Sequence, residues 1–89
     1  MTFKPIFSPA ALDDLESCDG KIAHRITKKV HEYCSMPNPF VFAKVLTGHM
    51  AGLYRFRVGK YRVIFEIDAQ GEVTVLMILR IKHRRESYR

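Results

Sequence analysis

The sequence has few cysteines, no long apolar run and no signal-peptide core, and each shortage excludes a class of protein. Two cysteines, Cys18 and Cys34, are too few to cross-link a small secreted domain, so we expect free thiols, with a disulfide between neighbouring helices as the alternative. No stretch approaches the roughly 18 apolar residues of a membrane-spanning helix. The N-terminal residues soon become acidic, unlike a secretion signal. These features predict one cytoplasmic domain over residues 1–89.

The common motifs for metals and nucleotides are also missing. The four histidines are scattered, and neither CxxC nor HExxH spacing occurs. There is no glycine-rich phosphate loop, no paired-carboxylate cluster and no nucleophile elbow. We therefore expect neither a metal nor another cofactor.

Positive charge is concentrated in two short segments. The net charge is +6, yet residues 53–65 and 80–89 together carry +8, so the rest of the chain carries −2. An excess confined in this way is typical of a surface that binds a polyanion. The alternatives are a solubilising surface and a site for an acidic protein partner.

Two helices are expected after a first strand over residues 2–7. Pro5 cannot donate a hydrogen bond in a sheet, which favours an edge position for that strand. Ser8 and Pro9 suit the N-cap and the first position of a helix that continues to about Cys18. The acids of this helix are expected to lie near its N-terminus and to favour its dipole: Asp13, Asp14 and Glu16. A second helix over residues 21–34 has one apolar stripe: Ile22, Ile26, Val30 and Tyr33.

The second half of the chain is expected to be mainly β-sheet. Residues 53–58, 61–67 and 72–79 have the composition and spacing of strands, whereas residues 40–48 are irregular. The element order βααβββ predicts an α+β fold, with a helical hairpin on one face of a mainly antiparallel four-stranded sheet.

The first β-hairpin fixes which side chains share a face. A two-residue turn at Gly59-Lys60 pairs Arg57 with Arg62. Side chains alternate along a strand, so one face is apolar and meets the helices: Tyr54, Phe56, Val58, Tyr61, Val63, Phe65 and Ile67. The opposite face, here called the arginine face, holds Arg55, Arg57 and Arg62. Like charges directly across a strand pair are destabilising, so we interpret the pair as a site for an anion.

The position of the last strand depends on the length of the second loop. If that loop has three residues, the core face gains Val73, Val75, Met77 and Leu79. The arginine face then gains Thr74, Leu76, Ile78 and Arg80. The basic C-terminal segment, residues 82–89, emerges beside it.

This arrangement suits RNA cleavage, because RNA carries its own nucleophile, the 2′-OH. Arginines around the phosphate would stabilise the charge of the transition state, and their planar groups match phosphate oxygens. A titratable group must move the protons, and the candidates are His83, Tyr88, Glu86 and Glu66. Tyr88 could instead stack on a base.

The chain resembles the RelE/ParE superfamily of toxins. The resemblance lies in GLYRFRVGKYRVIFEID at residues 52–68, in HRRESY at 83–88, and in a Lys-x-Leu-x-Gly pattern at Lys44, Leu46 and Gly48. It implies a toxin–antitoxin pair and neutralisation by a cognate antitoxin. The RelE branch implies metal-independent mRNA cleavage in the ribosomal A site, by 2′-OH attack.

By position, the resemblance matches the family's site residues to Arg55, Arg57, Arg62, Arg84 and Tyr88, with His83 matched only by its neighbourhood. We expect the catalytic residues to be Arg57, Arg62, Arg84, Tyr88 and His83. We expect five further residues to bind RNA phosphates: Arg55, Lys60, Arg80, Lys82 and Arg85. The main alternative is a ParE-type toxin, which shares the fold and inhibits DNA gyrase without cutting RNA. A third possibility is a binding module without toxicity.

Overall fold

The computed structural model describes residues 2–85, which form a sheet, two α-helices and two 3₁₀ helices. No helix within these residues is both long and apolar enough to cross a membrane. The elements in chain order are β1 (Thr2–Phe7), α1 (Pro9–Glu16), α2 (Gly20–Cys34), η1 (Pro39–Phe42), β2 (Ala43–Val45), η2 (Gly48–Met50), β3 (Tyr54–Val58), β4 (Tyr61–Gln70) and β5 (Val73–His83).

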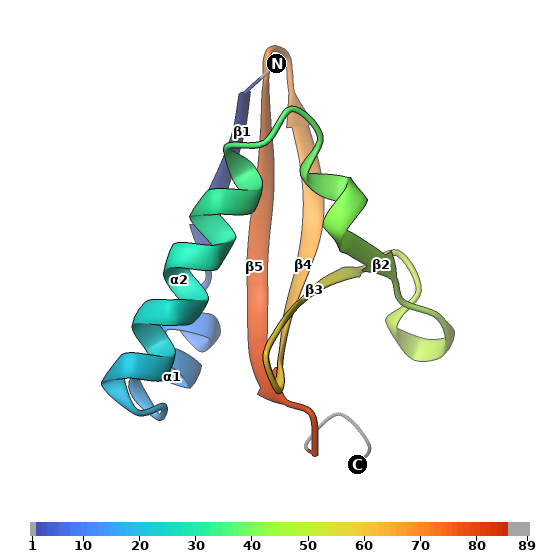
Figure 1. Cartoon of the computed structure of the whole chain (residues 1–89). Helices are drawn as coiled ribbons and strands as arrows, with labels where there is room; N and C mark the ends of the chain where they lie inside the picture. The colour runs from blue at the N-terminus through green and yellow to red at the C-terminus, as the bar shows by residue number, and fades with distance from the viewer. Residues whose placement is uncertain (1, 86–89) are drawn as a thin grey trace.

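The sheet is mixed and has the strand order β1-β5-β4-β3-β2, so β1 and β2 lie at opposite edges (Figure 1). β1 runs parallel to β5, and the other neighbours are antiparallel. The predicted α+β class and the edge position of the Pro5 strand are confirmed. The expected count of four strands is wrong, because Ala43–Val45 pairs with β3 as a fifth strand. This short strand lies in the segment whose sequence is irregular.

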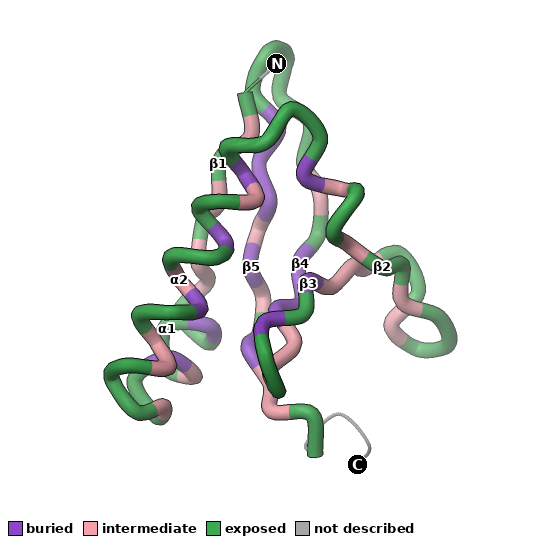
Figure 2. The backbone as a smooth tube through the Cα atoms, in the orientation of Figure 1, coloured by how far each residue is buried: buried purple, intermediate pink, exposed green. Residues whose placement is uncertain are grey.

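The core lies between the apolar face of the sheet and the helices, with most of the helical contribution from α2 and with Ala11 and Leu15 from α1. Ile26 and Val30 of α2 are fully buried, as the predicted stripe requires, and Figure 2 shows the buried residues of α2 on the side that faces the sheet. Phe56 and Phe65 stack in the centre with ring centroids 4.5 Å apart. Each buried side chain of this size contributes about 2 kcal/mol through removal of apolar surface from water.

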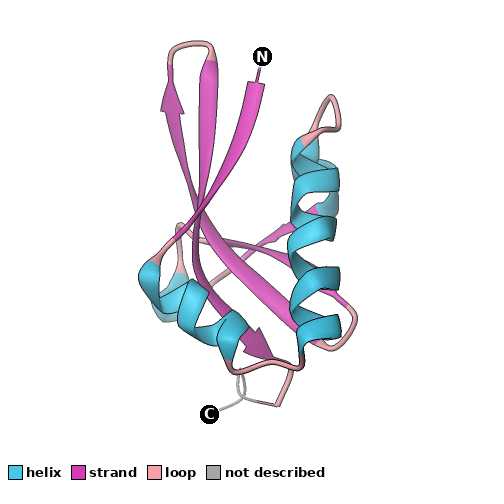
Figure 3. Cartoon of the chain, turned by 90° about the vertical axis from the view of Figure 1, so that its left-hand side faces the viewer, coloured by secondary structure: helices cyan, strands magenta, loops and turns pink. Residues whose placement is uncertain are grey.

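α1 is placed differently, along the edge of β5 that β1 leaves open. Ser8 caps α1 by accepting a hydrogen bond from the Ala11 N–H, and its hydroxyl donates to the Leu79 carbonyl at 2.9 Å. The Ser8 N–H donates to the Ile78 carbonyl at 2.8 Å. Figure 3 shows the two helices splaying apart from the short loop that joins them. The Leu79 carbonyl, which lies just beyond the residues of β5 that β1 pairs with, thus has a hydrogen-bond donor in Ser8.

The β4–β5 hairpin corrects the expected faces of β5. Gln70 pairs with Val73, so the loop has two residues, with Gly71 at a φ of 65°. Consequently Leu76 and Ile78 point into the core and are fully buried, contrary to the three-residue expectation.

A β-bulge then reverses the alternation within β5. The register shifts between Ile64, opposite Arg80, and Phe65, opposite Ile78, so Leu79 is the extra residue. Beyond the bulge Ile81 lies in the core, while Arg80 and Lys82 lie on the arginine face. The expected face of Arg80 is therefore right, but the bulge is the reason.

Candidate nucleic-acid interface

The arginine face carries a row of three cations across three strands. Arg57 of β3 is directly opposite Arg62 of β4, and Arg62 is directly opposite Lys82 of β5. The predicted register of the first hairpin is confirmed, with Gly59 at a φ of 59° in its turn. Like charges directly across a strand pair are destabilising by several tenths of a kcal/mol, and an anion bound between them would offset that cost.

A second cationic row lies two residues further along the strands, at a distance of about 7 Å. It runs from Lys44 of β2 through Arg55 of β3 and the buried Ile64 of β4 to Arg80 of β5. Among residues 2–85, no acid occupies either row. The nearest carboxylate on this face in β4 is that of Glu66, which is exposed and lies one row beyond Ile64.

The pKa of Arg55 is lowered by its position in this site, which is partly buried and rich in positive charge. Partial burial lowers the pKa of Arg55, and the positive charges of Arg57 and Arg62 lower it further. A guanidinium stays protonated at any physiological pH, so these arginines keep their charge. A phosphate between these side chains would accept hydrogen bonds from them and lower the repulsion.

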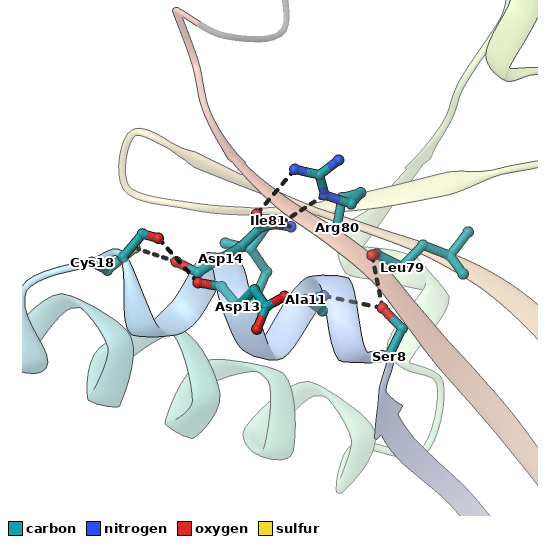
Figure 4. Close-up of polar contacts among 9 residues, drawn as sticks. Ser8, Ala11, Asp13, Asp14, Cys18, Leu79, Arg80 and Ile81 are labelled. Atoms are coloured by element: carbon teal, nitrogen blue, oxygen red, sulfur yellow. Dashed lines mark hydrogen bonds and ion pairs between the residues drawn. The ribbon is translucent and has the colours of Figure 1, made fainter.

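Arg80 is held by an acid that the sequence analysis assigned to another role. Its Nε lies 2.8 Å from the Asp14 Oδ2, and a second guanidinium nitrogen lies 3.0 Å from the Asp14 Oδ1 (Figure 4). Asp14 Oδ2 also accepts the Ile81 backbone N–H at 2.8 Å. Asp14 lies beyond the first turn of α1, which contains no acid, so the expected dipole role is wrong.

The pKa of Asp14 reflects the same contacts. Burial raises the pKa, but the hydrogen bonds from Arg80 and the Ile81 N–H, with the charges of Arg80 and Lys82, outweigh burial and leave the pKa below its usual value. The Arg80 guanidinium is therefore bound to Asp14 at the edge of β5. Its predicted contact with RNA would have to be made beside that carboxylate.

The C-terminal segment leaves the sheet at the β3–β4 turn. The Arg84 N–H donates to the Lys60 carbonyl at 2.7 Å, and the Arg85 N–H donates to the His83 Nδ1 at 3.2 Å. Lys60, His83, Arg84 and Arg85 line a pocket of about 320 Å³.

His83 is oriented away from the two cationic rows. It pairs in register with Tyr61, and their rings meet edge to face with centroids 5.1 Å apart. Tyr61 packs against the core, so His83 lies on the helix side of the sheet. Tyr88 and Glu86 lie outside the described residues.

The structure therefore brings part of the predicted set together. Arg55, Arg57, Arg62 and Lys82 share one face, whereas Lys60, His83, Arg84 and Arg85 gather at the adjoining end of the sheet. Lys44 is a further cation of this face and lies outside the two basic segments of the sequence. Its match to the Lys-x-Leu-x-Gly pattern was the available signal.

Comparison with known proteins decides the family. The family model described as the ParE toxin of the type II toxin–antitoxin system parDE matches residues 6–88. The chain belongs to this family of toxins. The predicted membership of the RelE/ParE superfamily is confirmed.

Named relatives agree with this assignment. The chain is 33% identical to Toxin RelG of Mycobacterium tuberculosis over 92 residues, covering 100% of this chain and 99% of the relative. The toxin–antitoxin complex RelBE2 of the same organism contains a chain with a TM-score of 0.69 and 26% identity, covering 94% of this chain and 100% of that one. The archaeal RelE–RelB complex of Pyrococcus horikoshii gives a TM-score of 0.67 and 27% identity, covering 94% of this chain and 97% of that one. Both structures are complexes of a toxin with its antitoxin.

Proposed function

We propose that this toxin is a ribosome-dependent endoribonuclease of the cytoplasm that cleaves mRNA without a metal, by attack of the 2′-OH on the adjacent phosphate. The observation that carries the proposal is the pair of cationic rows on the arginine face, centred on Arg57 opposite Arg62. Repulsion of this kind lowers stability, so its retention favours a role in binding a phosphate.

The rows provide electrostatic stabilisation of the transition state. As the 2′ oxygen attacks, negative charge grows on the non-bridging oxygens of the phosphate, and donors fixed beforehand stabilise it most in that state. Arg57 and Arg62 would bracket the scissile phosphate, and Arg55 and Lys82 would hold its neighbours. Arg84 would approach from the end of the sheet, where its backbone is fixed to Lys60.

The proton transfers are assigned to the C-terminal segment. Tyr88 is the first choice, because it is a titratable residue of the basic C-terminal segment and its hydroxyl can give or take a proton. His83 would have to leave its contact with Tyr61 to act on a phosphate in the cationic rows. In its observed position, His83 supports the start of the segment through the Arg85 N–H.

The proposed partners are a cognate antitoxin, the ribosomal A site and mRNA. Solved relatives in complex with RelB antitoxins support a toxin–antitoxin pair. We expect the antitoxin to cover the arginine face or to displace the C-terminal segment, since either would block the phosphate site. Lys60 and Arg85 would bind flanking phosphates from the same end of the sheet.

A second candidate is inhibition of DNA gyrase. The match of residues 6–88 to the ParE toxin model favours it, because ParE-type toxins share this fold. The dense arginines of the face favour RNA cleavage, since gyrase inhibition requires no transition-state stabilisation.

Primer extension on mRNA in a translating extract separates the two. The purified toxin should produce cleavage within codons only when ribosomes are present, and Arg57→Ala should abolish it. A gyrase supercoiling assay runs alongside. Inhibited supercoiling without any mRNA cleavage would replace the proposal with the gyrase alternative.

A further inference from the structure

We infer that a second basic site, the groove between α2 and the open edge of β3, binds backbone phosphates of RNA outside the cleaved position. The choice of RNA as the ligand rests on the proposed function. The groove has a volume of about 370 Å³ and is lined by Arg25, Lys28, Lys29, Glu32, Arg57, Val58 and Gly59.

The fold leaves this groove open because β2 is short. β2 pairs with β3 only from Tyr54 to Phe56, so the edge from Arg57 onward has no neighbouring strand within residues 2–85. α2 runs beside that edge and turns its basic surface towards it. A Cβ on residue 59 would lie 3.2 Å from a terminal nitrogen of Arg25, so a glycine there lets the guanidinium rest over the turn.

The groove has an excess of unneutralised positive charge. Four cations line it, and Glu32 is its one acid. Glu32 forms an ion pair with Lys29, whose Nζ lies 3.4 Å from the Glu32 Oε2. The Lys29 ammonium also lies 5.4 Å from the centre of the Tyr33 ring. Arg25 and Lys28 are exposed and form no ion pair within residues 2–85. These two side chains are available to a ligand.

Arg57 makes the groove continuous with the proposed catalytic face. It lines the groove and also stands opposite Arg62 in the first cationic row. A polyanion that lies across the arginine face can therefore continue past Arg57 towards Arg25 and Lys28. An RNA backbone supplies regularly spaced charges for such a path.

The lining disfavours a protein ligand. Protein interfaces are anchored by aromatic and aliphatic side chains at their centre. Val58 is the one aliphatic residue among the lining residues, and it is 5% exposed. Binding of a phosphate requires cationic side chains, and the groove has four of them.

The test measures binding without cleavage. A fluorescein-labelled 2′-O-methyl RNA hairpin has no free 2′-OH to attack, and its affinity can be followed by fluorescence anisotropy over a salt series. Lys28→Glu should weaken binding several-fold and reduce the slope of log K against log salt by about 1. Lys4→Glu is the matched control, because it makes the same charge change on the exposed Lys4 of β1, which is at the edge of the sheet opposite β2 and does not line the groove.

The two proposals fail in different ways. Equal effects of Lys28→Glu and Lys4→Glu would overturn the groove site, even if the wild-type toxin cleaves mRNA. A selective effect of Lys28→Glu would support the groove even if no cleavage is found. If Lys28→Glu weakens binding of polyglutamate but leaves RNA binding unchanged, the groove is a protein site and the inference is wrong. Thermal melts of both variants check that each protein is still folded.

Discussion

Arg57 and Arg62 lie directly opposite each other on adjacent antiparallel strands, and Lys82 follows Arg62 in the same row. Arg57 is exposed, so its removal creates no cavity. Arg57→Ala should therefore keep or slightly raise the free energy of unfolding, by roughly 0.2–1 kcal/mol, because it relieves repulsion. Cell toxicity should fall at the same time.

Urea unfolding and growth after induction measure the two effects. Lys4→Ala, an exposed charge on β1, serves as the control for loss of any surface cation. A strongly destabilised Arg57→Ala protein would show that Arg57 stabilises the fold, and would contradict a net repulsion between Arg57 and Arg62.

Asp14 should be a structural residue. Asp14→Asn weakens the contact with Arg80 and leaves an amide oxygen for the Ile81 N–H, so we expect a loss of about 1–2 kcal/mol in unfolding free energy. The lower part of this range is expected because the Arg80 side chain is 44% exposed. Asp13→Asn is the neighbouring control. Equal stabilities of the two variants would contradict the importance of this contact.

The contribution of Asp14 should depend on pH. Its folded-state pKa is below the ordinary value of 3.8, so the folded state favours the ionised form. The stability that this provides is present above the unfolded pKa and is lost as the pH falls through the folded pKa. The difference between wild type and Asp14→Asn should be constant near neutral pH and should shrink below about pH 4. A difference that grows on acidification would be the opposite of this expectation.

The last four residues should serve activity rather than folding. The contacts described for residues 83–85 do not involve residues 86–89, so the truncated chain should still fold, which circular dichroism checks. mRNA cleavage in the translating extract should be lost. Tyr88→Phe should lose cleavage if the hydroxyl moves a proton and keep it if the ring stacks on a base. Full mRNA cleavage by the truncated chain would show that residues 86–89 are not part of the active site.

The two cysteines should differ in reactivity. Both are free thiols, and burial raises the pKa of Cys34 to about 11, whereas Cys18 is partly exposed. Because the thiolate is the reactive form, a disulfide reagent at pH 8 should modify one thiol rapidly and the second only on unfolding. The rapid phase should disappear in Cys18→Ser. Equal rates for both thiols would show that the helix ends open readily.

The sequence predicts the first hairpin well because local chemistry fixes it. Gly59 provides the left-handed residue of a two-residue turn, and the turn sets every pair from Tyr54 to Phe65. The apolar stripe on α2 is also predicted from local sequence, because Ile26 and Val30 lie one helical turn apart and so share one side of the helix.

Other features depend on contacts between distant segments. The bulge at Leu79 has no glycine or proline to mark it, so the sequence does not predict the reversal of faces within β5. β2 has three residues and is a strand only because β3 offers it an edge. Asp14 reaches Arg80 across 66 positions of sequence, and only the chain path of α1 along β5 brings the two together.

The central claim is that the arginine face stabilises the transition state of RNA cleavage. Its most direct test is the single-turnover rate of mRNA cleavage on ribosomes with a programmed A site, for wild type, Arg62→Ala and the control Lys4→Ala. Arg62→Ala, shown to be folded by circular dichroism, should be slower by about 100-fold or more, and Lys4→Ala should match wild type. A folded Arg62→Ala protein that cleaves at the wild-type rate would contradict the claim.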